Sequence, residues 1–351
     1  LEFPFGALKP GETKSWSISR KLPLALSERA DLVEFEVHSD TPTKEQKTTT
    51  IAEITAEEPP SFTYRVTIDD RKGGNGDGLL QQGESVQLLI DVKNVGETLG
   101  RDAFVTVRNS GGAEVFLKVG RASLGEIKAG KSKRADLTFD VKGSPGVDQA
   151  KFQVSIWDGE FATGFSDDLT IPITQSKATK AARKFVEAST ELEVRSGADL
   201  DAPAVGVLKA GARARVDLTV GGFSRVLLGG NSFGFVESSK VKAVKRGRKK
   251  VGFKPALGQE PPRIGMSLPK LVTEDDSVTL EVRVSDRDAL RDMYIFVNDQ
   301  KVFFSKFADT VRGQDGESVV VRPRIPLEEG TNEVGLIVRE SETLMGRRTF
   351  A

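Results

Sequence analysis

Strict alternation of apolar and polar residues runs through most of this chain and limits what it can fold into. In one segment Val86, Leu88, Ile90 and Val92 would share one face, with polar residues between them. Because successive side chains of a strand point to opposite faces, each such run predicts a half-buried strand of an antiparallel sheet. The period recurs in Ala135, Leu137, Phe139 and Val141; Phe152, Val154 and Ile156; Val278, Leu280, Val282 and Val284; and Val334, Leu336 and Val338.

Helical periodicity is scarce. Only residues 177–188, and a turn or two within residues 22–30, favour a helix. The 35 glycines suit a chain in which many short strands need many turns. The predicted fold class is therefore all-β.

Domain boundaries are marked by paired prolines. Glu58-Pro59-Pro60 and Glu260-Pro261-Pro262 both precede strand-like segments, and a third boundary falls near residues 174–183. Consecutive prolines cannot donate to a ladder and favour extended backbone, so these sites suit linkers. A chain of 351 residues is also too long for one ordinary domain.

An internal repeat singles out the start of the chain. FGALKPGETKSW at residues 5–16 aligns with LGEIKAGKSKRA at residues 124–135, which lies in the middle of a predicted sandwich beginning at residue 61. The first copy has no such preceding half. We therefore expect residues 1–58 to be the C-terminal half of a sandwich, and the chain to be a fragment of a longer protein.

Few residues of the chain are candidates for a catalytic role. The single histidine, His38, and the absence of cysteine exclude histidine-based triads, cysteine nucleophiles and most zinc sites within this chain. The stretch from Gly125 to Ser132 satisfies the phosphate-loop pattern, but a strand pattern follows where that loop requires a helix. We predict that the chain has no catalytic residues.

Charge indicates no preference for nucleic acid or membranes, because Lys plus Arg and Asp plus Glu each number 51. No apolar run approaches the ~20 residues of a membrane span. Residues 240–254 hold eight basic residues of fifteen. This stretch is interpreted as a solvated linker extended by self-repulsion, with binding of an anionic polymer as the alternative.

The loop GGNGDGLLQQGE offers a candidate calcium site. Counted from Gly73, Asn75 and Asp77 occupy the third and fifth positions of an EF-hand loop, and Glu84 occupies the twelfth. Calcium takes oxygen ligands, so the candidate ligands are Asn75, Asp77, the Leu79 carbonyl and Glu84, with Asp69 or Asp70 replacing the missing first-position aspartate. The alternative is a turn in which Glu84 accepts hydrogen bonds from backbone N–H groups.

Residues 190–244 contain L-x-V-R-S-G, V-G-x-L-K-A-G, G-G-F-S-R-V and G-F-V-E-S. This stretch resembles a bacterial SH3-like module, a small barrel common in envelope and wall-associated proteins and linked to peptide or peptidoglycan binding. The resemblance implies a ligand face carrying Arg195, Phe223 and Phe235. Phenylalanine replaces the family's usual tryptophan at Phe223 and in the G-W-V motif, so the indole N–H of such a platform is missing.

Residues 61–174 resemble adhesion-type immunoglobulin-like domains, in D-D-x4-N-G-D-G-L-L-x2-G-E, V-K-N-V-G and L-G-E-I-K-A-G. Residues 262–351 look like another sandwich, with a hairpin at Asn298-Asp299. The predicted architecture is thus tandem immunoglobulin-like β-sandwiches flanking a small SH3-like barrel. The predicted domains are residues 1–58, 59–176 with the NGDG loop, 183–246 as the barrel, 247–261 as a basic, proline-containing linker, and 262–351.

This order of modules resembles the non-catalytic C-terminal region of tail-specific (C-terminal-processing) serine peptidases of myxobacteria. The resemblance implies a periplasmic, envelope or secreted bacterial protein whose catalytic domain lies outside this chain. The expected partners are a protein substrate or the protein's own peptidase domain. The alternative is a stand-alone adhesion or wall-binding protein in which the SH3-like module binds peptidoglycan.

Overall fold

The computed structural model describes the chain except for residues 40–45, 144–145, 175–178, 230–231, 247–250, 257, 268, 288–289 and 308–317. Every regular element of the described residues is a strand, apart from a short 3-10 turn, η1 (Ser238–Lys240). Neighbouring strands of each sheet run antiparallel. The predicted all-β class is confirmed.

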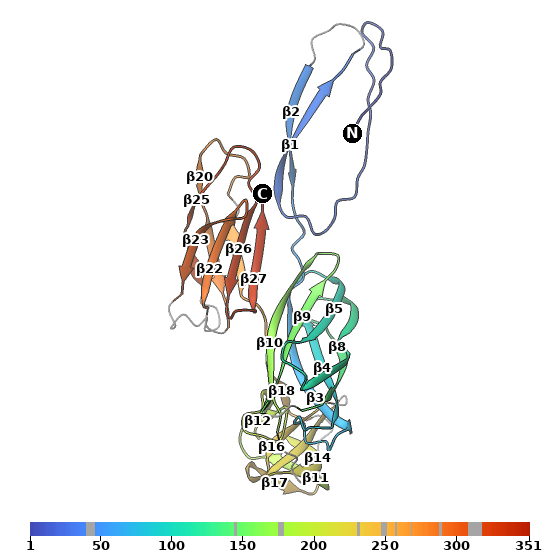
Figure 1. Ribbon diagram of the computed structural model, residues 1–351, viewed down its shortest axis with the longest axis vertical. Helices are drawn as coiled ribbons and strands as arrows, with labels where there is room; N and C mark the ends of the chain where they lie inside the picture. Colours follow the sequence, from blue (N-terminus) through green and yellow to red (C-terminus); the bar gives the residue numbers. More distant parts are fainter. Residues whose placement is uncertain are drawn as a thin grey trace.

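The N-terminal part is a single hairpin of β1 (Arg29–Val37) and β2 (Gln46–Ile54), seen at the top of Figure 1. Large apolar side chains on it, including Leu32, Phe35 and Val37, are exposed to solvent. No described residue before Pro60 is buried. In the described portion of residues 1–58, no second sheet covers the hairpin. That these residues are half of a larger sandwich stays a prediction.

The first sandwich packs two four-stranded sheets face to face. At their interface the Phe139 ring meets the Phe152 ring at 5.1 Å between centroids. Val86, Leu88, Ile90 and Val92 are all fully buried, as their alternation predicts. In sheet order, the strands are β3 (Phe62–Gly73), β4 (Ser85–Asn94), β8 (Ser132–Val141) and β6 (Val115–Val119), and β10 (Thr163–Pro172), β9 (Gln149–Asp158), β5 (Gly100–Asn109) and β7 (Arg121–Ile127).

The next module, called the middle module below, is one eight-stranded sheet with its own buried cores. In sheet order its strands are β17 (Val241–Val244), β11 (Thr179–Ala188), β14 (Arg213–Val220), β15 (Phe223–Gly229), β16 (Ser232–Glu237), β12 (Leu192–Arg195), β13 (Ala204–Leu208) and β18 (Phe253–Pro255). The outer strands β17 and β18 do not pair with each other in the described residues, so the sheet does not close into the expected barrel.

Two expectations within this module are wrong. Residues 179–188 of the predicted helix form β11, because that segment pairs with β14 on one side and β17 on the other. This pairing outweighs the helix propensity of its Ala and Lys residues. The basic stretch is also more structured than a solvated linker, since β17 and β18 lie within it; residues 247–250 are outside the described residues.

The C-terminal sandwich has a core of its own, in which Val282, Leu336 and Val338 are buried and Val278 is partly buried. Asn298 and Asp299 adopt φ angles of 47° and 66°, as a two-residue hairpin with both φ values positive requires. Its strands, in sheet order, are β19 (Arg263–Ser267), β21 (Glu281–Ser285) and β24 (Val319–Val321); β20 (Ser277–Thr279) and β25 (Arg324–Pro326); and β23 (Gln300–Lys306), β22 (Asp292–Val297), β26 (Val334–Arg339) and β27 (Met345–Phe350).

The C-terminal sandwich lies beside the first sandwich (Figure 1). Leu344, in the turn before β27, is buried within the core cluster of the first sandwich. The Ala351 N–H donates to the Glu28 carbonyl at 3.0 Å, which joins the C-terminal sandwich to the start of the N-terminal hairpin. In the part of the chain that is described, no helix is long and apolar enough to span a bilayer.

Candidate functional site

The loop that connects β3 and β4 is organised around the buried Asp70. Its carboxylate accepts hydrogen bonds from the backbone N–H groups of Gly76 at 2.9 Å, Asp77 at 3.0 Å and Gly78 at 3.1 Å. Asp70 is fully buried. One carboxylate thus satisfies three consecutive backbone donors and holds the loop in a tight arc.

Asp77 and Glu84 act in the same way on the rest of the loop. Asp77 Oδ1 accepts from the Leu79 N–H at 2.9 Å. Glu84 accepts from the Asn75 N–H at 3.1 Å and the Gln81 N–H at 3.0 Å. Backbone capping by Glu84, one of the two sequence-based alternatives, is therefore present in the structure.

Burial is the largest influence on the pKa values of Asp70 and Glu84. It raises the pKa of Asp70, and the nearby Asp77 carboxylate raises it further against the backbone hydrogen bonds that lower it. Burial likewise raises the pKa of Glu84, with Asp70 and Asp77 adding to the effect. Three carboxylates share a small volume here and their charges repel one another.

The loop geometry favours the hydrogen-bonded turn over a metal site. The carboxylates of Asp70, Asp77 and Glu84 accept from the loop's own N–H groups, and the Asn75 amide nitrogen donates to Asp77 Oδ2 at 3.1 Å. Across the described residues, no group of three or more His, Cys, Asp or Glu side chains is arranged to hold a metal ion. Calcium binding by these residues and Leu79 stays a prediction.

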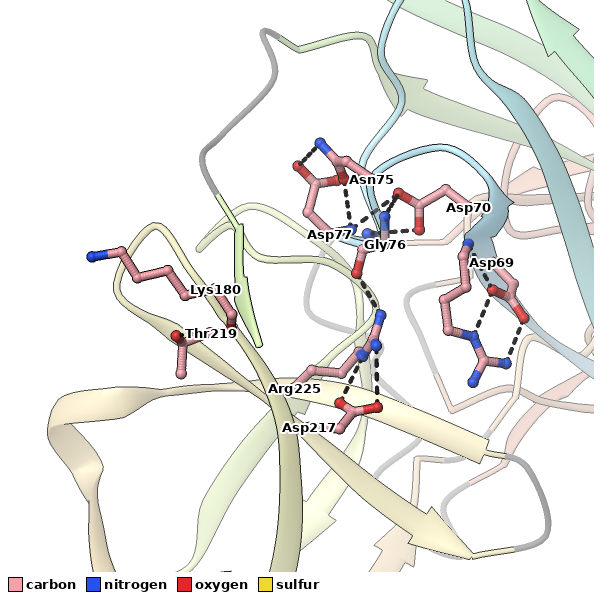
Figure 2. A network of polar contacts seen from close by, with 11 residues as sticks. Asp69, Asp70, Asn75, Gly76, Asp77, Lys180, Asp217, Thr219 and Arg225 are labelled. Carbon is pink, nitrogen blue, oxygen red and sulfur yellow. Dashed lines mark hydrogen bonds and ion pairs between the residues drawn. The ribbon is translucent and has the colours of Figure 1, made fainter. Parts of the chain in front are cut away.

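The outer side of the same loop contacts the middle module. Arg225 Nη1 donates to the Gly76 carbonyl at 2.7 Å, and the Ala198 N–H donates to the Asp77 carbonyl at 3.1 Å. The Arg225 guanidinium is held from its own module by Asp217, at 2.9 and 3.1 Å (Figure 2). The NGDG loop is therefore a junction between two modules.

Glycine at position 78 is required by this junction. Gly78 has a φ of +73°, and a Cβ there would lie 2.6 Å from the Phe235 ring and 2.7 Å from the Ser196 carbonyl oxygen. Only a residue without a side chain allows the loop to approach the middle module so closely. Gly78 thus serves contact between the two modules.

Cations and an aromatic ring extend the junction. The Arg71 guanidinium lies 4.4 Å from the Phe233 ring centroid, and Arg225 lies 5.5 Å from the same centroid. Arg71 is itself paired with Asp69 at 2.6 Å. Each cation–π contact adds on the order of 0.5–1 kcal/mol at a partly exposed site.

The three residues of the predicted ligand face come together in the structure. Arg195, Phe223 and Phe235 line one pocket of about 250 Å³. Phe235 is fully buried and Phe223 is only 7% exposed, so both rings lie beneath the pocket and offer little accessible surface. The remaining lining residues are Thr190, Glu191, Leu192, Glu193, Glu237 and Lys240.

Charges around this pocket are mostly paired. Arg195 donates to Glu193 at 2.6 Å and to the Ala202 carbonyl at 2.9 Å. Lys240 donates to Glu237 at 2.5 Å. Glu191 has no ion pair to any described residue, so the pocket offers one carboxylate to a ligand.

His38 lines neither of the two pockets; it follows β1, with its side chain 68% exposed and 3.6 Å from Glu36. The phosphate-loop lookalike is the turn from β7 to β8, with no helix after it. The sequence-based reading missed Arg225, Asp217 and Ala198. No local pattern marks them, because Arg225 and Ala198 bind loop residues more than a hundred positions away and Asp217 acts through Arg225.

No protein-family model matches the chain, and no curated protein matches it. Among solved structures, 87% of the chain aligns with the crystal structure of dimeric latent PorU from Porphyromonas gingivalis, at 9% sequence identity and a TM-score of 0.21. The chain covers 35% of that PorU chain. A likeness this weak carries no argument about what this chain does.

Proposed function

We propose that this chain is a non-catalytic binding and positioning region of a secreted or envelope bacterial protein. The pocket of Arg195, Phe223 and Phe235 takes a short peptide segment, and the junction at the NGDG loop sets its direction relative to the first sandwich. The observation that carries the proposal is the convergence of these three side chains on one pocket.

The chemistry of the pocket supports a ligand with an apolar body and a basic group. Phe223 supplies a small apolar surface above the buried Phe235 ring, and Glu191 supplies a carboxylate without an ion pair to any described residue. Small pockets of this kind bind through apolar surface and a few placed polar groups. At about 250 Å³ the pocket suits one or two side chains of a peptide.

The pocket is also coupled to the junction. Phe235 lines the pocket and lies against Gly78 of the loop. A peptide bound in the pocket would be held in a fixed orientation relative to the first sandwich. The protein that carries this peptide would then have a raised effective concentration near the chain. Such positioning fits a region accessory to a tail-specific serine peptidase whose catalytic domain lies outside this chain.

The alternative function is attachment to the cell wall through the same pocket. A pull-down on purified sacculi separates the two, since strong retention favours wall attachment and no retention favours the accessory role. Phe223→Ala is expected to abolish either binding, whereas Phe116→Ala, which removes an exposed ring on β6, is the matched control. Hydrolysis of casein or cell wall by the purified chain would contradict the non-catalytic proposal.

A further inference from the structure

A second, larger hollow lies between the first sandwich, the linker before the C-terminal sandwich and the C-terminal sandwich itself. Its volume is about 960 Å³. We call it the junction cleft. Its lining residues come from β3, β4, the turn before β8, residues 255–263 and β21.

The floor of the junction cleft is fixed by backbone pairing. Tyr64 and Gln259 exchange both backbone hydrogen bonds, at 2.9 and 2.8 Å, so the linker adds to the edge of β3. The Thr63 hydroxyl donates to the Gln259 carbonyl at 2.7 Å. A Cβ at Gly258 would lie 2.5 Å from the Tyr64 carbonyl oxygen, so glycine is needed where the linker meets the strand.

The wall of the junction cleft that the C-terminal sandwich forms is hydrogen-bonded to the same linker. Arg287, which follows β21, donates to the Gly258 carbonyl at 2.5 Å and lies 3.9 Å from Glu260. Glu260 also binds Arg263 at 3.1 Å. The walls are therefore held in place without a ligand, and a preformed cleft avoids the entropy of ordering its walls on binding.

Positive charge exceeds negative charge in the lining. It holds five cations, Arg65, Lys93, Arg263, Arg283 and Arg287, and three carboxylates, Asp91, Glu260 and Asp286. Arg65 is paired with Asp91 at 3.1 Å. Lys93 and Arg283 are exposed and form no ion pair with any described residue, so these two cations face the cleft ready for an anion.

We infer that the junction cleft binds an acidic segment of a partner polypeptide, whose carboxylates pair with Lys93 and Arg283. Guanidinium groups bind carboxylates through two parallel N–H donors, which gives geometric selectivity. The interspersed carboxylates would repel a uniform polyanion and accept a basic residue of a mixed sequence. Small lining residues, among them Gly130, Ser132 and Ala256, leave room for an extended backbone.

The test uses the full chain and a fluorescein-labelled decapeptide of alternating Glu and Ser, followed by fluorescence anisotropy. The double variant Lys93→Glu, Arg283→Glu is expected to weaken binding by about tenfold or more, because two attractive charge contacts with the peptide become repulsive. Lys151→Glu on β9, an exposed cation that does not line the cleft, is expected to leave binding within about twofold of wild type.

Further measurements separate binding of an acidic peptide in the junction cleft from the alternative explanations. Phe223→Ala should leave binding of the acidic peptide intact. This variant therefore separates a failure of the proposed peptide pocket in the middle module from a failure of the junction cleft. Tighter binding of poly-Glu than of the Glu–Ser peptide would overturn the peptide assignment in favour of an anionic polymer. No binding at millimolar peptide, or equal loss in the Lys151→Glu control, would overturn the site. Thermal unfolding of each variant checks that it is folded.

Discussion

Arg225 of the middle module donates a hydrogen bond of 2.7 Å to the backbone carbonyl of Gly76 in the first sandwich. Arg225 is only 8% exposed, and its guanidinium also donates to Asp217 of its own module. A buried, charge-assisted bond to a carbonyl contributes about 1.5–3 kcal/mol. This side chain and the glycine-rich loop are therefore two of the contacts that set the relative direction of these modules, together with Arg71 over the Phe233 ring.

Removing this side chain should loosen the junction. Arg225→Ala is expected to speed amide exchange of the loop and of residues 196–198 by about tenfold or more, since one lost bond of this kind exceeds about 1.4 kcal/mol. Hydrogen-exchange mass spectrometry measures this. Arg215→Ala, on the adjacent strand and exposed, is the control. Equal exchange in the two variants would show that Arg225 does not hold the loop.

A methyl group at position 78 should disrupt the same junction. Gly78→Ala combines a strained φ of +73° with a Cβ 2.6 Å from Phe235, so we expect a loss of about 1–3 kcal/mol in unfolding free energy. Urea unfolding measures the loss. Gly83→Ala has a φ of +91° but an open site, and so isolates the backbone strain. If both variants lose the same stability, the close approach to Phe235 is unimportant.

Acid should remove the stabilisation that Asp91 provides. Burial pushes the pKa of Asp91 up, but hydrogen bonds from Arg134 and Arg65 outweigh it and bring the pKa below its ordinary value of 3.8. Stability from this lowered pKa is present above pH 3.8 and is lost as the pH falls through the folded-state value. The difference in unfolding free energy between wild type and Asp91→Asn should therefore shrink from neutral pH towards about pH 2. A constant difference over that range would contradict the assignment.

Calcium provides the test of the loop itself. Because the loop carboxylates already accept backbone N–H groups, we expect millimolar Ca²⁺ to leave the melting temperature unchanged. A rise that is lost in Asp77→Asn would instead establish the calcium site predicted from the EF-hand-like spacing. Isothermal calorimetry on the full chain gives the same answer independently of stability.

Particular residues show how much of the structure could be predicted from the sequence. The alternation identified the inward faces correctly, since Leu137, Phe152 and Leu336 are buried as predicted. Arg195, Phe223 and Phe235, which a family resemblance groups together, line one pocket, and their role in ligand binding stays a prediction. Prediction from the sequence failed at residues 179–188, where an Ala- and Lys-rich segment favours a helix locally but pairs as a strand on both sides.

The amino-acid sequence by itself determined the β class, the inward faces of the strands and the Asn298-Asp299 turn, because these depend on neighbours only one or two positions away. Only the tertiary structure decided what the NGDG loop contacts, whether the middle sheet closes, and that Lys93 and Arg283 line the same cleft. Those outcomes depend on how whole modules are oriented relative to one another. Contacts between residues so distant in the chain produce no periodic pattern in the amino-acid sequence.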